Sequence, residues 1–196
     1  MMSAHNSKTA VVTGGGTQIA HDQTKALVAQ GLNVILLGQE PLQLMAVREE
    51  LGTQVIPYQI DTATTFDEPL WHHFIQKRVP SVSLMLFNLD TPQEDSLDAD
   101  FEAVINATAK NPYFILMNAV KQLTPNSQIV TVTLPKFKID KMPFYRGALA
   151  AQQQLFQSIG AFIQYTPKQE HQPADWLKMA KGEEVPEWLR IDSNDR

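Results

Sequence analysis

The stretch KTAVVTGGGTQIA, residues 8–20, decides the fold of this chain. Residues 10–12 form a short apolar run, which is typical of a buried β-strand, and Gly14, Gly15 and Gly16 follow almost at once. Apolar residues at helical spacing come next, which predicts a helix packed on a sheet. A strand, a glycine turn and a helix present free backbone N–H groups to a phosphate, and the helix dipole adds roughly half a positive charge there.

Apolar runs and helical patterns alternate along the rest of the chain. Strands are predicted at 33–37, 54–58, 82–87 and 128–133, and helices at 17–30, 41–51, 66–78, 100–123 and 144–163. Pro112 lies inside the fourth helix, so we expect a kink or a new start there. This alternation predicts an α/β fold. It is a Rossmann-like, doubly wound parallel sheet of at least five strands in order 3-2-1-4-5, with helices on both faces and the glycine turn at its carboxyl edge.

Composition excludes several classes of function. The chain has 196 residues, a net charge of -5 and no basic run, which argues against nucleic acid as a main partner. It contains no cysteine, so disulfides, thiolate catalysis and cysteine–metal sites are excluded. The histidines show no metal-ligand spacing with carboxylates, so no metal site is predicted. Residues 1–7 are polar and no apolar run is long enough to span a bilayer, so we expect a cytoplasmic protein with no membrane partner.

Two segments differ in their patterns. Residues 1–163 are predicted to form the Rossmann-like domain, and residues 164–196 a short C-terminal helical extension packed on that domain. Within the extension, a stub of strand is expected at 164–167. Two apolar pieces follow, whose Trp176 and Trp188 are expected to cover an edge of the sheet.

The glycine turn resembles the opening pattern T-G-x-x-x-G-[IL]-G of the short-chain dehydrogenase/reductase family. Thr13, Gly14 and Ile19 match that pattern, whereas Gln18 and Ala20 replace its second and third glycines. Other segments resemble the family in order and spacing: GLNVILLGQ at 31–39, Asp61-Thr62, LFNLD at 86–90, the segment 101–112, IVTVTL at 129–134 and YRGALA at 145–150. The chain therefore resembles a divergent, C-terminally shortened member of this family.

The resemblance implies a nicotinamide cofactor, NAD or NADP, at the carboxyl edge of the sheet. The implied cofactor contacts are Thr13, Gly14, Gly15, Gly16, Gln18, Ile19, Gln39, Asp61 and Asn88. Gln18 puts a long side chain where the family keeps bare backbone, so we expect weak binding. Gln39 stands where NADP-preferring members carry arginine, and Glu40 either repels a 2′-phosphate or is an ordinary solvated glutamate, so the choice of cofactor stays open. A tight turn that binds nothing is the alternative.

The resemblance also implies a catalytic tyrosine, lysine, serine and asparagine, of which this chain keeps one. Tyr145 occupies the tyrosine position, but the lysine position one helical turn later holds Leu149. The serine position is Leu134, with Thr133 beside it as a second candidate, and the asparagine position is Thr108. A tyrosine with a pKa of about 10 is a poor base at neutral pH without a nearby cation.

The nearby cations do not restore this arrangement. Arg146 is adjacent to Tyr145 and so faces about 100° away around the helix. Lys141 would reach Tyr145 only if the helix started early, which Pro143 opposes. Without a cation, Tyr145 is read as an ordinary half-buried tyrosine with its hydroxyl in the former substrate cleft.

Two functions follow from these substitutions. The first is a divergent dehydrogenase-like protein with weak or no hydride transfer, which works as a binding or regulatory module. The second is a genuine NAD(P)-dependent oxidoreductase that acts on a carbonyl or alcohol substrate with Tyr145 as general acid or base. The sequence leaves both open and names no substrate.

The resemblance implies a homodimer through helices 100–123 and 144–163. These helices carry more apolar residues than one stripe facing the sheet requires. The excess is greatest at Phe114, Met117, Leu155 and Ile159. We expect a two-fold dimer that Phe156→Glu converts to a monomer, unless the C-terminal extension covers this patch. A small-molecule ligand is the other predicted partner.

Overall fold

The computed structural model describes residues 8–61, 66–89, 101–133, 139, 142–163 and 168–170. They form one parallel sheet in the order β3-β2-β1-β4-β5-β6, which confirms the predicted order 3-2-1-4-5 and adds a sixth strand. The strands are β1 (Thr9–Val12), β2 (Asn33–Gly38), β3 (Val55–Gln59), β4 (Val82–Asn88), β5 (Leu123–Val132) and β6 (Lys168–Glu170).

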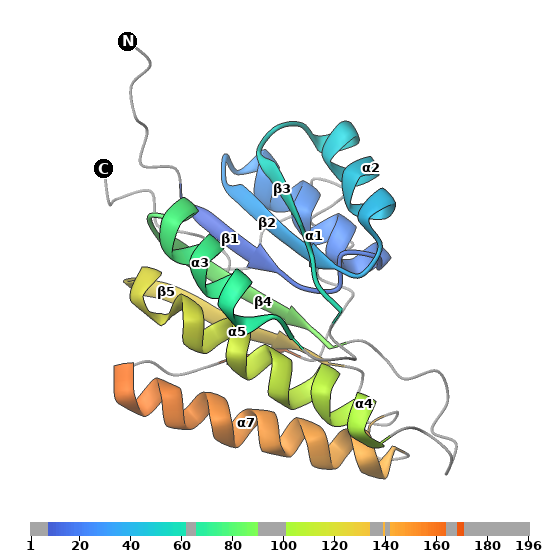
Figure 1. Cartoon of the computed structure of the whole chain (residues 1–196), viewed down its shortest axis with the longest axis vertical. Helices are drawn as coiled ribbons and strands as arrows, with labels where there is room; N and C mark the ends of the chain where they lie inside the picture. Colours follow the sequence, from blue (N-terminus) through green and yellow to red (C-terminus); the bar gives the residue numbers. More distant parts are fainter. Residues whose placement is uncertain are drawn as a thin grey trace.

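Helices cover both faces of this sheet (Figure 1). On one face lie α1 (Gln18–Ala29) and α2 (Pro41–Leu51), and on the other lie α3 (Glu68–Arg78), α5 (Asn111–Ala119) and α7 (Pro143–Ile163). The central strands are apolar on both sides because successive side chains point to opposite faces. Val12 packs in the cluster under α1 and α2, and its neighbour Val11 packs under α3, α5 and α7.

The helical region after β4 is divided at Pro112, as predicted. It begins with α4 (Phe101–Ile105), widens into a π-helical segment (Asn106–Lys110), continues as α5 and ends in a 3-10 turn (Val120–Gln122). Pro112 lacks an N–H and therefore cannot continue an ordinary helical ladder. The N–H of Asn111 instead donates to the carbonyl of Asn106, five residues earlier.

Two strands differ from the sequence prediction. β5 begins at Leu123 rather than at residue 128, and its pairing with β4 shifts register between Val82 and Leu84. A sixth strand, β6 at Lys168–Glu170, pairs in parallel with β5 just beyond the expected stub at 164–167. The predicted boundary after residue 163 therefore falls before the last strand of the sheet. The expected stub itself, together with Trp176 and Trp188, lies outside the described residues.

Within the described part of the chain, none of the helices combines the length and apolar character that crossing a membrane requires.

Candidate functional site

The glycine turn after β1 lies directly against the end of β2. Gly14 has a φ of +76°, a conformation that glycine adopts without strain. The N–H of Gly15 donates to the carbonyl of Leu37 at 2.7 Å. A Cβ on Gly15 would lie 2.4 Å from Cδ2 of Leu44 and 2.9 Å from that carbonyl oxygen, so only glycine fits there. The backbone of Gly38 closes the contact from the β2 side.

Thr17 joins this turn to helix α1. Its hydroxyl donates to the carbonyl of Gly14 at 2.8 Å and accepts the N–H of Ala20 at 3.2 Å. Its own N–H donates to the same Gly14 carbonyl at 2.9 Å. Thr17 is therefore the N-cap of α1, and it fixes the turn relative to the positive end of the helix dipole.

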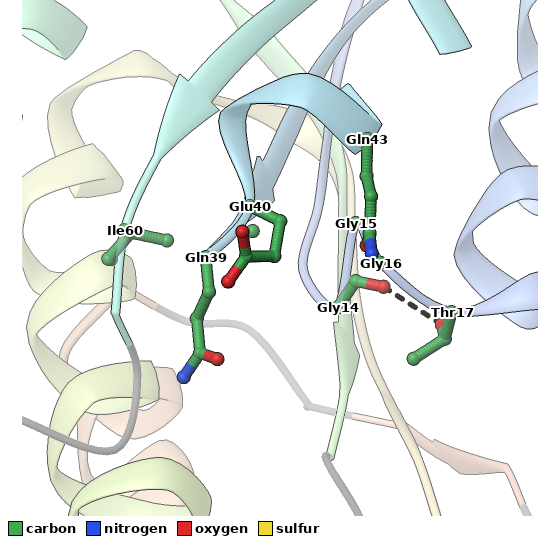
Figure 2. Close-up of a pocket in the computed structure, with 9 residues that line it drawn as sticks. Gly14, Gly15, Gly16, Thr17, Gln39, Glu40, Gln43 and Ile60 are labelled. Atoms are coloured by element: carbon green, nitrogen blue, oxygen red, sulfur yellow. Dashed lines mark hydrogen bonds between the residues drawn. The ribbon is translucent and has the colours of Figure 1, made fainter. Parts of the chain in front are cut away.

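A pocket of about 210 Å³ opens at the carboxyl edge of β1, β2 and β3. Figure 2 shows the glycine turn on one side of it and the ends of β2 and β3 on the other, with the start of α2 above. Its lining residues are Gly14, Gly15, Gly16, Thr17, Gly38, Gln39, Glu40, Gln43 and Ile60. The carboxyl edge of a parallel sheet is where ligands bind in open α/β folds.

Two predicted contacts, Gln39 and Asp61, lie together beside this pocket. The Nε2 of Gln39 donates to Oδ1 of Asp61 at 2.6 Å, across the ends of β2 and β3. The N–H of Ile60 donates to the carbonyl of Gly38 at 2.8 Å, which joins the same two strand ends through the backbone. Ile60 and Gln39 therefore line this end of the pocket, and Asp61 holds the Gln39 side chain from outside the lining.

Gln43 is a lining residue that the sequence analysis missed. A Cβ on Gly16 would lie 2.6 Å from Oε1 of Gln43, so this side chain reaches from α2 down to the glycine turn. Figure 2 shows it pointing at Gly15 and Gly16. Its position three residues after Glu40, in the first turn of a helix that follows β2, is the signal from which it could have been found.

Gln18 does not lie over the turn, which corrects its predicted position. Its Nε2 donates to Oδ1 of Asp22 at 2.9 Å, one helical turn along α1, and Gln18 is not a lining residue. His21 also contacts Asp22, at 3.5 Å, and contacts Glu50 of α2 at 3.0 Å. Ile19, another predicted contact, packs against the core beneath α1. Gln18 and Ile19 therefore make contacts along and beneath α1, and neither lines the pocket.

Thr13 and Asn88, also predicted as cofactor contacts, lie beneath the turn. The Nδ2 of Asn88 donates to the carbonyl of Thr13 at 2.8 Å, and the hydroxyl of Thr13 donates to the carbonyl of Asn88 at 3.1 Å. The side chain of Asn88 also forms a reciprocal amide pair with Gln23 of α1, at 2.6 and 2.9 Å. This buried tie joins β1, β4 and α1, and it fixes the strand end that carries the glycines.

The predicted catalytic residue Tyr145 is fully buried, so its interpretation as a half-buried tyrosine is wrong. It lies in an apolar cluster with Leu89, Ile139, Met142 and Leu149, which we call the Tyr145 cluster. As predicted, Leu149 shares a helix face with Tyr145.

Neighbouring catalytic candidates are placed as follows. Arg146 is exposed, as expected for a residue that faces away from Tyr145. Thr133 is buried at the end of β5 and Thr108 is buried in the π-helical segment. Leu134 and Lys141 lie outside the described residues.

The residues expected at a dimer surface do not share one environment. Phe114 and Leu155 are half-buried. Ile159 and Phe156 are buried on the side of α7 that faces the sheet. The ring centroid of Phe156 lies 5.0 Å from that of Phe87. Their assignment to a free surface is therefore wrong, because α7 directs them at the sheet. Phe101 and Met117 are exposed, at 55% and 43%.

Among the described residues, no group of three or more His, Asp or Glu side chains could hold a metal ion.

Comparisons with known proteins agree with this geometry. A family model for short chain dehydrogenases matches residues 8–165. No curated protein matches the chain.

Solved structures resemble the chain in fold. BdcA from E. coli is 16% identical with a TM-score of 0.65, covering 89% of this chain and 86% of its own. A metagenomic short-chain oxidoreductase in complex with NADP is 18% identical with a TM-score of 0.66, covering 89% and 88%. A short-chain oxidoreductase from Pseudomonas aeruginosa PAO1, described as containing an atypical catalytic center, is 16% identical with a TM-score of 0.67, covering 83% and 68%.

Proposed function

The chain belongs to the short-chain dehydrogenase family, and from that premise we propose that it is a divergent member which binds a nucleotide with weak or no hydride transfer. Its role is then that of a binding or regulatory module. The observation that carries this proposal is the complete burial of Tyr145 beside Leu149. The chain has the oxidoreductase fold of the family, and the proposal concerns whether it also carries out the family's hydride transfer.

The chemical argument concerns the missing cation. A tyrosine has an ordinary pKa of about 10, so it exchanges protons efficiently at neutral pH only where a positive charge favours the phenolate. The position one turn after Tyr145 holds a leucine, and the adjacent Arg146 is exposed. A buried side chain is also closed to a substrate carbonyl, which must come within hydrogen-bond reach of its general acid.

The binding argument concerns the fit of NAD(P), the cofactor of the family. The pocket at β1–β3 suits its adenosine part, with Gln39 and Asp61 at the base end, Glu40 at the ribose and the start of α1 at the phosphate. The Tyr145 cluster does not suit the nicotinamide part, because its buried side chains are packed against one another. We therefore propose that the chain binds NAD(P) weakly and carries out little or no hydride transfer.

The alternative function is a genuine NAD(P)-dependent oxidoreductase with Tyr145 as general acid or base and Thr133 near the substrate. Family membership favours it. It requires the Tyr145 cluster to open when substrate binds, so that the hydroxyl can reach a carbonyl oxygen.

A turnover assay separates the two functions. The pure protein is mixed with NADH or NADPH and a panel of aldehydes and ketones, and cofactor absorbance is followed. We expect no turnover above the rate without protein. Turnover that disappears in Tyr145→Phe but persists in Tyr113→Phe, a matched change on α5, would establish the oxidoreductase instead.

A homodimer and a cytoplasmic location complete the proposal. The exposed Phe101 and Met117 support an interface that includes the helical region after β4. Light scattering at micromolar concentration tests it, since a monomer has a mass of 22.0 kDa. The informative variant is Met117→Glu, because Phe156 lies in the core and its substitution would unfold the sheet.

A further inference from the structure

Helices α3 and α5 lie side by side on one face of the sheet, and hydrogen bonds join them (Figure 1). The indole Nε1 of Trp71 donates to the carbonyl of Ile115 at 3.1 Å. The Nδ2 of Asn118 donates to Oε1 of Glu68 at 3.1 Å, and its Oδ1 is hydrogen-bonded to Nδ1 of His72 at 2.7 Å. The outer sides of the two helices therefore form one continuous surface, which we call the α3–α5 surface.

Large apolar side chains are exposed on the α3–α5 surface. Leu70 of α3 is 62% exposed and Met117 of α5 is 43% exposed. The half-buried ring of Phe66, which precedes α3, stacks on that of Phe114 in α5, with 6.4 Å between the ring centroids. We call these four residues the apolar patch. Apolar side chains gathered on an outer surface commonly mark an interface.

The exposed side of α7 has a different composition. Within residues 143–160, its exposed residues after Pro143 are small or polar: Arg146, Gly147, Ala150, Ala151, Gln154, Gln157 and Ser158. Neither 103–139 nor 141–163 contains an aspartate or a glutamate. If α5 and α7 packed on their own copies, Lys110, Lys121 and Arg146 would face like charges, with no acid on either helix to pair with them.

The α3–α5 surface carries both signs of charge, at opposite ends. Asp67 and Glu68 lie at the start of α3. The far end carries the cations Lys77, Arg78 and Lys121. A hydrogen bond of 3.2 Å from Gln76 to Gln122 holds the end of α3 beside the turn that follows α5. Lys110, at the start of α5, is the exception to this order. A two-fold copy packed antiparallel would place each acidic end on the partner's basic end.

We propose that the homodimer forms through the α3–α5 surface, packed on a second copy of this chain about a two-fold axis. The inference rests on the homodimer of the proposed function and deepens it, because it names the surface. It differs from the interface that the family resemblance implies, since α7 takes no part. The apolar patch of one protomer covers that of its partner, and opposite charges meet at both ends of α3.

Light scattering of the whole protein with two matched variants tests this surface. Leu70→Arg puts a charge in the apolar patch, so the dissociation constant of the dimer should rise at least about thirtyfold. Ala150→Arg puts the same residue on the exposed side of α7 and should leave a dimer with a mass of about twice 22.0 kDa. Circular dichroism checks that both variants are folded, which we expect because both positions are exposed.

The outcomes separate this surface from the homodimer itself. A monomeric Ala150→Arg, or a dimer that Leu70→Arg leaves unchanged, would overturn the α3–α5 surface and leave the homodimer standing. A wild-type mass of 22.0 kDa at every concentration would overturn both. The proposed nucleotide binding stands in either case.

Charge reversal tests the antiparallel arrangement. Lys77→Glu places an acid opposite the partner's acidic end, so the dissociation constant should rise about tenfold. Adding Glu68→Lys to the same chain restores opposite signs and should bring the constant to within about threefold of the wild type. Lys25→Glu, the same change at an exposed position of α1, is the control and should have no effect. Failure of Glu68→Lys to restore the dimer, or an equal loss in Lys25→Glu, would overturn the arrangement.

Discussion

The two halves of one sheet edge have different properties in this protein. At the ends of β1–β3 the chain turns on glycines and leaves an open pocket, whereas beside the ends of β4 and β5 the Tyr145 cluster is buried and apolar. Both are carboxyl ends of parallel strands, where ligands of such folds bind. The first half depends on backbone shape and on the end of a helix. The second depends on particular side chains, which a few substitutions can remove without disturbing the sheet.

The largest effect is expected from placing a cation in the Tyr145 cluster, beside the ends of β4 and β5. Leu149→Lys restores the family's lysine but buries a charge among aliphatic side chains, which should lower the free energy of unfolding by about 3–5 kcal/mol. Leu149→Met, which keeps the volume, should cost less than about 1.5 kcal/mol. Urea unfolding measures both. A Leu149→Lys protein that is as stable as the wild type and reduces a carbonyl substrate would show that this half is open.

The next largest effect is expected at the buried hydrogen bonds of Asn88, which hold the glycine turn on the sheet. Asn88→Leu removes the hydrogen bond from the Asn88 side chain to the Thr13 carbonyl and leaves the buried Gln23 without its amide partner, so it should cost about 2–3 kcal/mol. Gln23→Leu alone should cost a similar amount. The double variant should cost less than the sum of the two, because neither amide is then left buried without its partner. Simple additivity in urea unfolding would contradict the reciprocal pair.

Two glycine-to-alanine changes, one in the turn and one in α7, are expected to have smaller effects on stability and of opposite sign. Gly15→Ala puts a methyl 2.4 Å from Cδ2 of Leu44, so it should destabilise the protein by about 1–3 kcal/mol and weaken NADH binding. Gly147→Ala places the same methyl in a helix with nothing within 4 Å, so it should stabilise by about 0.5–1 kcal/mol. Thermal unfolding compares them. Equal effects of the two changes would mean that Gly15 is not in close contact with Leu44.

The sequence predicted the sheet and the glycine turn because both depend on local patterns. Strand order followed from apolar runs spaced by helices, and the turn followed from three adjacent glycines. The burial of Tyr145 did not follow, since Ile139 and Met142 cover it from a segment with no periodic pattern. The amide pair of Gln23 and Asn88 joins residues 65 positions apart, and no local rule connects them.

Gln18 is an instructive exception, because its position was predictable from a local rule. Gln18 and Asp22 are four residues apart on a helix, where an amide and a carboxylate commonly form a hydrogen bond. The resemblance to a glycine of the family instead predicts that the Gln18 side chain covers the turn. A side chain that replaces a family glycine has its own local contacts, and those decide whether it obstructs a ligand.

The smallest effect tests this point directly. Gln18→Gly removes the bond to Asp22, worth about 0.2–0.5 kcal/mol, and adds the flexibility of glycine at the first residue of α1. The free energy of unfolding should fall by about 0.5–1 kcal/mol in total. NADH affinity should change by less than about twofold, because the Gln18 side chain does not line the pocket.

Gln18→Ala serves as the control for that change, since it removes the same side chain while keeping a good helix former. It should leave NADH affinity unchanged and cost less stability than the glycine variant. If both variants instead bind NADH about tenfold more tightly, the Gln18 side chain covers the glycine turn in solution. The half of the edge that we describe as open would then be partly closed as well, and the contrast with the Tyr145 cluster would be one of degree.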